Sequence, residues 1–302
     1  MTVIRSSGDL LADRRYAYAA AALMEGDAGA AADLAEQTLE RAPQYAPAWA
    51  VLGRARLRLG EDAPAREALE RAVALDPADG LGVRIDLSRL GVVDPADAIA
   101  RAYVRALFDD YADRFERHLV EALNYRGPAL LIDALDRVAP GRRFARALDL
   151  GCGTGLMGAA LRSRVASLAG CDLSAAMVEK ARLKDVYDEL AVAELTAYLR
   201  GAPEGGADLV TAADVLIYIG DPCWVLAAAA RAMAPGGLFA FSVQSHDGEG
   251  FVIGPDARFA HAVPFIRERA GAQGLRVMSC EPASIRQDQG RDVPGHVFVL
   301  ER

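Results

Sequence analysis

The pattern of apolar and polar positions changes character along the chain. Residues 10 to 79 are rich in alanine, carry apolar positions at helical spacing and show no strand-like alternation. From residue 129 onward, short apolar runs bounded by glycine alternate with helical segments, which predicts a parallel sheet covered by helices. The expected strands are 147–150, 168–171, 189–193, 209–212, 238–243, 275–280 and 296–300. We therefore expect an N-terminal all-α domain followed by an α/β domain.

The N-terminal helices repeat along the sequence. Gly26 is matched by Gly60 and Pro43 by Pro77, each 34 residues later. This period, and the segment Trp49-x-x-Leu52-Gly53 in the second copy, resemble the tetratricopeptide repeat. The resemblance implies that residues 1–97 form a repeat domain that ends in a capping helix and a linker. Such helices either offer a surface to a protein partner or pack as plain helical pairs, and the sequence leaves both open.

A further helix is expected between the two domains. Asp94-Pro95 is typical of a helix start, and the apolar stripe of Phe108, Tyr111 and Phe115 predicts a helix that runs to about residue 123. We expect residues 98–128 to form a lid helix over a ligand, with Tyr111 or Tyr125 touching that ligand. Core packing alone explains the stripe about as well.

The most informative stretch joins the first predicted strand to the helix after it. Asp149-Leu-Gly151-Cys152-Gly153-Thr-Gly155 places three glycines between a buried strand and a helix N-terminus. Glycines expose bare backbone to a ligand, and a helix N-terminus adds unpaired N–H groups and a positive dipole end. The sequence therefore predicts a nucleotide-type site at this turn.

Two motifs compete for the turn. Gly153-x-Gly155-x-x-Gly158 fits the dinucleotide fingerprint, but its first glycine comes two residues too late for a strand that ends at Leu150. Asp149-x-Gly-x-Gly-x-Gly instead resembles the first motif of class I S-adenosylmethionine-dependent methyltransferases. That resemblance is favoured. It implies a Rossmann-like, seven-stranded sheet, S-adenosyl-L-methionine as cofactor, and a cofactor loop made of Asp149, Gly151, Cys152, Gly153 and Gly155.

The later motifs agree with this family. Asp172 ends the second strand, 172 − 149 = 23 residues after Asp149, and the resemblance implies that it accepts the ribose hydroxyls. Leu173 and Met177 would flank the adenine. Glu194, with the backbone N–H of Leu195, would read the adenine edge. Residues 101 to 302 together resemble a complete class I enzyme of a bacterial group of tetratricopeptide-containing methyltransferases.

The acceptor side is less defined. Asp214 and Tyr218 follow the fourth strand, where open α/β sheets bind ligands, and we expect them to face the reacting methyl group or its acceptor. An acceptor that loses a proton needs a base near neutral pKa, for which His246 and His261 are the main candidates and His118 a weaker one. We expect Arg258 to His261 to open a helix and His296 to be structural.

Composition sets the remaining expectations. The 302 residues have a net charge of −8, which argues against a nucleic-acid partner, and no apolar run approaches a membrane span. The four cysteines lack C-x-x-C spacing, and the N-terminus lacks a signal-peptide pattern, so we expect no metal site and a cytoplasmic protein. The expected function is methyl transfer to an O, N or C nucleophile of an unidentified, small-molecule acceptor. The alternatives are a repeat-based interaction module with a cofactor-gated scaffold, and an NAD-dependent oxidoreductase.

Overall fold

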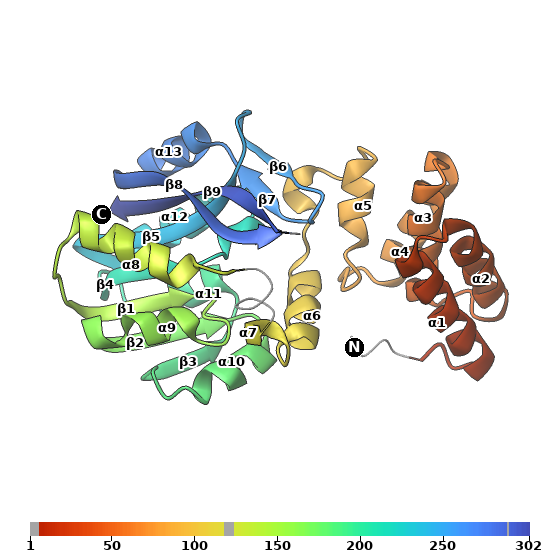
Figure 1. Cartoon of the computed structure of the whole chain (residues 1–302), viewed down its shortest axis with the longest axis horizontal. Helices are drawn as coiled ribbons and strands as arrows, with labels where there is room; N and C mark the ends of the chain where they lie inside the picture. Colours follow the sequence, from red (N-terminus) through yellow and green to blue (C-terminus); the bar gives the residue numbers. More distant parts are fainter. Residues whose placement is uncertain (1–5, 118–123, 289) are drawn as a thin grey trace. The chain divides into compact units, whose positions relative to one another are not determined.

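The computed structural model describes residues 6–117, 124–288 and 290–302. The chain divides into two compact units, Met1–Leu107 and Phe108–Arg302 (Figure 1). The boundary falls inside one helix, α6 (Arg101–Tyr111), ten residues beyond the boundary expected at residue 97.

The first unit is a stack of helices with the predicted repeat. Its helices are α1 (Leu10–Glu25), α2 (Ala28–Arg41), α3 (Ala46–Arg58) and α4 (Asp62–Leu75). Gly26 and Gly60 have φ values of 90° and 77°, so each ends its helix in a left-handed conformation that suits glycine. At Gly53 a Cβ would come within 2.6 Å of the Leu69 side chain, so the glycine lets α3 and α4 pack closely. The glycines of the repeat thus mark helix ends at Gly26 and Gly60 and a close helix contact at Gly53.

The expected capping helix is also present. It is α5 (Val83–Arg89), followed by a 3-10 turn, η1 (Pro95–Asp97). The carboxylate of Asp79 is buried and accepts the backbone N–H groups of Val83 and Arg84, at 2.7 and 3.1 Å, at the start of α5. Asp94 caps η1 in the same way through the N–H of Ala96.

The predicted helix to residue 123 is wrong in its extent. Helix α6 ends at Tyr111, and a short helix, α7 (Phe115–Arg117), follows a turn. Residues seven apart in a straight helix lie about 10 Å apart along its axis, whereas the ring centroids of Phe108 and Phe115 are 5.9 Å apart. The turn lets Phe115 fold back against Phe108, and this aromatic contact outweighs helix continuity. The end of the predicted helix, with the candidate base His118, lies outside the described residues.

The second unit is an α/β fold built on one sheet (Figure 1). The seven predicted strands are present, with β3, β2, β1, β4 and β5 neighbours in that order and parallel, and with β9 antiparallel to β5 and paired to β8. Their bounds are β1 Phe144–Leu150, β2 Val165–Asp172, β3 Glu189–Val192, β4 Ala207–Ala212, β5 Met233–Ser245, β8 Arg276–Asp288 and β9 Arg291–Glu301.

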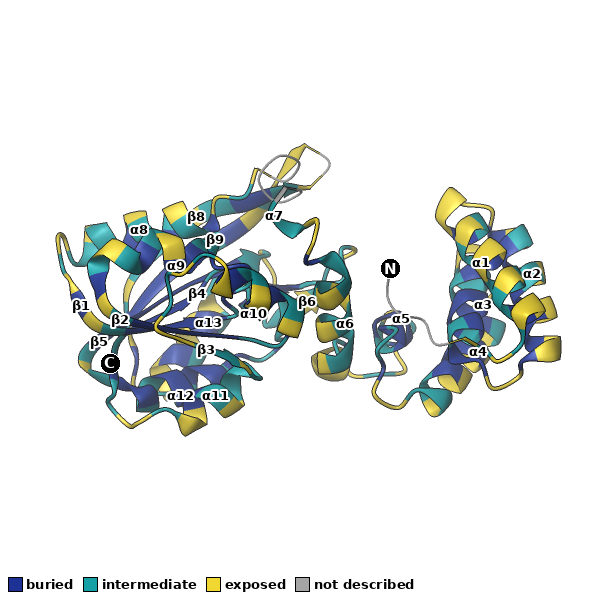
Figure 2. Ribbon diagram, turned by 90° about the horizontal axis from the view of Figure 1, so that it is seen from below, coloured by how far each residue is buried: buried dark blue, intermediate teal, exposed yellow. Residues whose placement is uncertain are grey.

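Helices cover both faces of this sheet, and its central strands are buried (Figure 2). One apolar cluster joins the sheet to α8 (Gly127–Val138) and α9 (Leu156–Leu161), which continues into η3 (Arg162–Arg164). The other joins it to α11 (Leu195–Gly201), α12 (Cys223–Ala232) and α13 (Val263–Ala272). Helix α10 (Ala175–Arg182) links β2 to β3 and buries Met177, Val178 and Ala181. The carboxyl ends of the parallel strands therefore share one edge.

Two expectations for the C-terminal part need correction. Arg258 to His261 does not open a helix, because Phe259–His261 forms β7, which pairs with β6 (Phe251–Ile253) and with the end of β5. The described sheet therefore has nine strands instead of seven. The edge-to-face contact between Phe251 and Phe259, with ring centroids 5.5 Å apart, stabilises this hairpin, and helical spacing would separate the two rings.

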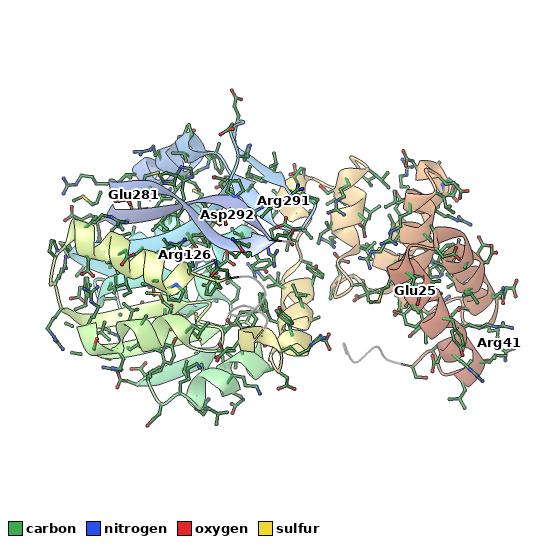
Figure 3. All side chains as sticks on the ribbon, in the orientation of Figure 1. Glu25, Arg41, Arg126, Glu281, Arg291 and Asp292 are labelled. Carbon is green, nitrogen blue, oxygen red and sulfur yellow. The ribbon has the colours of Figure 1, made fainter. Side chains whose placement is uncertain are left out.

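The second correction concerns the last two strands, which are longer than predicted. They form a hairpin that extends to Asp288 and Arg291, and it includes much of the polar segment between the two predicted strands. Arg291 and Asp292 lie near its tip, on the side where Arg126 precedes α8 (Figure 3). The N–H of Arg126 donates to the carbonyl of Ile285, at 2.9 Å. Cross-strand backbone pairing thus outweighs the low apolar content of this segment.

Candidate functional site

The glycine loop after β1 is built so that only glycine fits it. Gly151, Gly153 and Gly155 have φ values of 61°, 54° and 92°, a region that other residues enter only with strain. A Cβ on Gly151 would lie 2.6 Å from Val215, so this glycine is needed for packing as well. On Gly153 the nearest atom to such a Cβ would be Phe115 Cε1, at 3.8 Å. The middle of the loop is therefore bare backbone, with the Phe115 ring in van der Waals range of Gly153.

Asp172, at the end of β2, is joined to this loop. Its carboxylate accepts the N–H of Gly153 and the N–H of Ser174, both at 2.9 Å. Burial raises the pKa of the carboxyl, which the hydrogen bonds from Ser174 and Gly153 oppose. Sequence reasoning placed Asp172 at a ribose, and the structure adds that the same carboxylate holds the loop in place.

Asp149 lies inside the sheet and not at the surface of the site. It is 1% exposed, and its two oxygens accept the hydroxyls of Tyr187 and Thr211, at 2.7 and 2.9 Å. Burial raises the pKa of this carboxyl to about 6, although both hydrogen bonds oppose the shift. Its hydrogen-bond partners are thus protein groups under the loop. Tyr187 was missed from the sequence, because no motif marks it.

Cys152 contributes its backbone to the loop. Its N–H donates to the carbonyl of Cys171, at 2.9 Å, which links the loop to β2. Burial, followed by the charges of Asp149 and Asp172, raises the pKa of its thiol. The thiol is therefore a neutral packing group, and the residue matters for the shape of the loop.

The residues expected around an adenine lie at the ends of β2 and β3. Met177 is fully buried in α10, and Leu173 is half-buried. The carboxylate of Glu194 accepts the N–H groups of Thr196 and Ala197, at 3.0 and 2.9 Å, and so caps α11. Leu195 is the first residue of that helix and is half-buried. The structure brings these four residues to the same edge of the sheet as Asp172.

An ionic cluster lies beyond β4, where Asp214 was expected. Asp214 has a φ of 59°, and its carboxylate accepts Arg286 Nη1 at 2.8 and 3.0 Å. The Arg286 side chain is 3% exposed, and its Nη2 also donates to Gln244, at 3.0 Å, and to Asp256, at 3.3 Å. Arg286 belongs to the β8–β9 hairpin, so residues from four separate segments meet here. No spacing in the sequence marks this cluster.

Tyr218 is the second polar group of this region. Its hydroxyl accepts Arg258 Nε at 3.3 Å, and its ring meets Phe108 edge to face with centroids 5.4 Å apart. Burial raises the pKa of Tyr218, against the opposing effect of Arg258. The hydroxyl of Tyr125 lies 3.5 Å from the carbonyl of Ala213, next to Asp214. Tyr125 and Tyr218 thus lie by the same turn after β4.

The histidines occupy different environments. His261 is fully buried, and its Nε2 lies 2.8 Å from the carbonyl of Ile219 and 3.0 Å from that of Gly220. Because carbonyls only accept, Nε2 carries the proton, and burial lowers the pKa of the ring. His246 accepts the N–H of Gly248 at Nδ1, which leaves its proton on a buried Nε2. His296 contacts Ser245 from inside β9, as expected of a structural residue.

The segment 108–117 lies against α10. The hydroxyl of Ser174 donates to Asp109, at 2.5 Å. Lys180 pairs with Asp113 and Lys184 with Glu116, both at 2.7 Å. Tyr111 meets Phe115 edge to face, with ring centroids 5.5 Å apart, and Phe115 faces Gly153. The predicted lid residues are thus adjacent to the glycine loop.

Comparisons with known proteins identify the family. The family profile for a methyltransferase domain matches residues 123–279, slightly over half of the 302 residues. The chain belongs to the methyltransferase family. A profile for the tetratricopeptide repeat matches residues 22–82. The chain thus combines a methyltransferase domain with N-terminal tetratricopeptide repeats, as the sequence predicted, and S-adenosylmethionine is the cofactor of this family.

Curated relatives agree with this assignment. The ubiquinone biosynthesis O-methyltransferase of Ralstonia nicotianae is 31% identical over 172 residues, which are 52% of this chain and 71% of that protein. Its namesake from Thiobacillus denitrificans is 35% identical over 36% of this chain and 48% of that protein. Methyltransferase-like protein 27 of Homo sapiens is 32% identical over 46% of this chain and 57% of that protein. The chain thus spans about half the length of several curated relatives.

Solved structures share the fold. A 1,6-didemethyltoxoflavin-N1-methyltransferase from Burkholderia thailandensis has a TM-score of 0.55 at 16% identity and covers 70% of this chain and 91% of that chain. A magnesium protoporphyrin IX methyltransferase from Synechocystis has a TM-score of 0.52 at 18% identity, over 67% of this chain and 99% of that chain. The Rossmann-like fold is therefore confirmed. Among the described residues, no helix is both long and apolar enough to span a bilayer.

Proposed function

We propose that this protein transfers a methyl group from S-adenosylmethionine to an O, N or C nucleophile of a small molecule. The observation that carries the proposal is the junction of the bare glycine loop with Asp172. An ionised carboxylate has about four acceptor sites, and Asp172 uses some of them for the N–H groups of Gly153, Ser174 and Leu173. The remaining acceptor capacity can take a ribose hydroxyl.

Each expected cofactor residue has a role in this proposal. When bound, the cofactor supplies a methyl group on a positively charged sulfonium. Gly151, Gly153 and Gly155 let the backbone approach the amino-acid end, and Asp149 with Cys152 holds that loop. Leu173 and Met177 flank the adenine. The edge of the adenine meets Glu194 and the N–H of Leu195. We assign residues 129–302 to the catalytic domain, 98–128 to the lid and 1–97 to the repeat domain.

The acceptor is placed beyond β4, beside Asp214 and Tyr218. Arg286 holds Asp214 through two short contacts, so Asp214 is a fixed negative charge facing this region. Tyr218 accepts a hydrogen bond from Arg258, which leaves its own proton available to the acceptor. Holding the nucleophile in line with the methyl group accounts for most of the rate, in favourable cases about 7–11 kcal/mol. Two of the three curated relatives named above are O-methyltransferases, which favours oxygen as the acceptor atom.

The two candidate histidines, His246 and His261, differ in which ring nitrogen is free to take a proton. His261 donates from Nε2 to the carbonyls of Ile219 and Gly220, and its buried Nδ1 has no hydrogen-bond partner among the described residues, so the Nδ1 lone pair is unused. His246 presents an Nε2 proton in its present tautomer and must change tautomer to act as a base. We therefore place His261 ahead of His246 as the general base.

Equilibrium dialysis tests the proposal directly. The protein is expected to retain S-adenosylhomocysteine and S-adenosylmethionine but not NAD. Asp172→Ala should weaken S-adenosylhomocysteine binding by about 1.5–3 kcal/mol, the range for a hydrogen bond to a charged group. Binding of NAD in place of the sulfonium compounds would support the oxidoreductase alternative. Incubation of labelled S-adenosylmethionine with metabolite fractions would then identify the acceptor.

A protein-binding role for the repeats is a second candidate, and exposed apolar residues favour it. Leu10 and Met24 of α1 are 88% and 87% exposed, and Tyr18 is 55% exposed. Large contiguous apolar patches on a protein surface mark interaction sites. Replacing Met24 with Glu, with Glu25→Gln as the control, should abolish a cross-link between this chain and a protein partner in cells. An unchanged cross-link pattern would contradict this role.

A further inference from the structure

Tyr187 occupies a space that three glycines leave open. It lies between α10 and β3, and its ring reaches the glycine loop, α9 and β2. A Cβ on Gly158 would overlap the phenol, one on Gly170 would lie 2.8 Å from its Cε1, and one on Gly155 would lie 3.2 Å from its Cε2. Gly170 belongs to no cofactor motif, and Gly158 lies outside the methyltransferase motif. Their small size is explained by the tyrosine ring.

The Tyr187 hydroxyl joins two groups under the loop. It donates to Asp149, at 2.7 Å, and accepts the N–H of Gly158, at 3.2 Å. An ionised carboxylate can only accept, so the phenol proton points to Asp149 and an oxygen lone pair faces Gly158. The direction of both hydrogen bonds is therefore fixed by chemistry.

The Gly158 N–H is a group that needs an outside partner. Helix α9 begins at Leu156, so the N–H of Gly158 is among the first four, which have no partner within a helix. A Ser, Asp or Thr at the preceding N-cap normally supplies one, but that position is Gly155, with a φ of 92° and no capping side chain. The loop geometry that exposes backbone to a ligand thus excludes the usual cap. Tyr187 supplies the cap from a distant segment.

We propose that Tyr187 is a positioning residue for the cofactor: it caps α9 through Gly158, braces Asp149, and so fixes the glycine loop in its binding conformation. The inference rests on the proposed function. Because both hydrogen-bonding directions of its hydroxyl are used, Tyr187 acts through the loop backbone. Removing the hydroxyl frees the N–H of Gly158 and removes one of the two donors to Asp149.

Tyr187→Phe tests this, since it keeps the ring between the glycines and removes only the hydroxyl. Tyr198→Phe is the matched control, because Tyr198 is a half-buried tyrosine of the same unit that packs against the core. Calorimetric titration with S-adenosylhomocysteine is expected to give a Kd at least fivefold higher for Tyr187→Phe and unchanged for Tyr198→Phe. Thermal unfolding of the ligand-free proteins checks that both variants fold.

A spectroscopic readout separates positioning from general stability. With glycine-selective ¹⁵N labelling of the ligand-free protein, the Gly158 amide of Tyr187→Phe should shift upfield and exchange faster with solvent. Equal Kd values for wild type and Tyr187→Phe, or an unchanged Gly158 amide, would overturn the inference. If the wild type itself does not bind S-adenosylhomocysteine, the proposed function fails instead, so the two failures are distinguishable.

Discussion

Asp149 links burial to a pH-dependent stability. Burial raises its pKa from 3.8 to about 6. The folded state therefore holds the proton more tightly than the unfolded state. The stabilisation from this proton is complete below about pH 3.8 and is lost as the pH rises through about 6. A shift of this size corresponds to about 3 kcal/mol in the free energy of unfolding.

Asp149→Asn should remove this dependence, because the amide stays neutral. In urea unfolding of the ligand-free protein, the variant is expected to gain stability relative to wild type as the pH rises from 4.5 to 8. Asp188→Asn is the flat control: hydrogen bonds from Leu168 and Arg162 lower the pKa of Asp188 below 3.8, so the stability difference between this variant and wild type should stay nearly constant from pH 4.5 to 8. A difference between wild type and Asp149→Asn that stays constant over this pH range would contradict the prediction.

Gly153 tests whether the bare loop serves a ligand. Gly153→Ala places a side chain on a backbone with a φ of 54°, which costs about 1–2 kcal/mol of strain. Gly141→Ala has matching strain, with a φ of 67° and no atom within 4 Å of its Cβ, but lies in the turn before β1. Both variants should lose similar stability in thermal unfolding. Only Gly153→Ala is expected to lose S-adenosylhomocysteine affinity, and equal affinities would refute a ligand at the loop.

At the scale of the element, the segment 108–117 is expected to move with the cofactor. It contacts α10 through the pairs Asp113–Lys180 and Glu116–Lys184, whose side chains are between 27% and 87% exposed. Exposed pairs of this kind stabilise by about 0–1 kcal/mol. These contacts orient the segment without locking it. Closing over a ligand often limits turnover in enzymes of this design.

Amide exchange with and without S-adenosylhomocysteine tests this movement. Peptides from residues 108–117 should gain protection from exchange when the ligand is present. Peptides from α12, which covers the face of the sheet opposite α8 and α9, should keep the same protection. Equal protection of 108–117 in both states would identify a static wall in which Phe108 and Phe115 are ordinary core residues.

At the scale of the whole molecule, each unit carries its own fluorescent reporter. The chain has two tryptophans, Trp49 in the first unit and Trp224 in the second. Trp49→Phe and Trp224→Phe therefore yield single-tryptophan proteins that report the two units separately. A ligand present at 100 times its Kd stabilises the state that binds it by about 2.7 kcal/mol.

The prediction is that S-adenosylhomocysteine raises the unfolding temperature reported by Trp224, in the Trp49→Phe protein. Each protein without ligand serves as its own reference, and NAD at the same concentration serves as the ligand control. A shift seen by Trp49 but not by Trp224 would contradict a cofactor site in Phe108–Arg302.

Much of this protein was predictable from the sequence by itself. Local patterns determined the order of helices and strands, the repeat of 34 residues, the glycine loop, and the family with its cofactor, because the glycine conformations and strand ends that carry them are local. The position of Asp172 at the end of β2 also predicted its place beside the glycine loop, because parallel strands end at one edge of the sheet.

Only the tertiary structure decided which side chains meet. Arg286 reaches Asp214 from 72 residues away, and Tyr187 reaches Asp149 from 38 residues away, so neither pair leaves a periodic or short-range signal. The same limit explains the errors. The break after Tyr111 and the strand at Phe259–His261 come from aromatic contacts between segments, which outweigh local helical preference. Packing across the chain, and not propensity along it, decided these features.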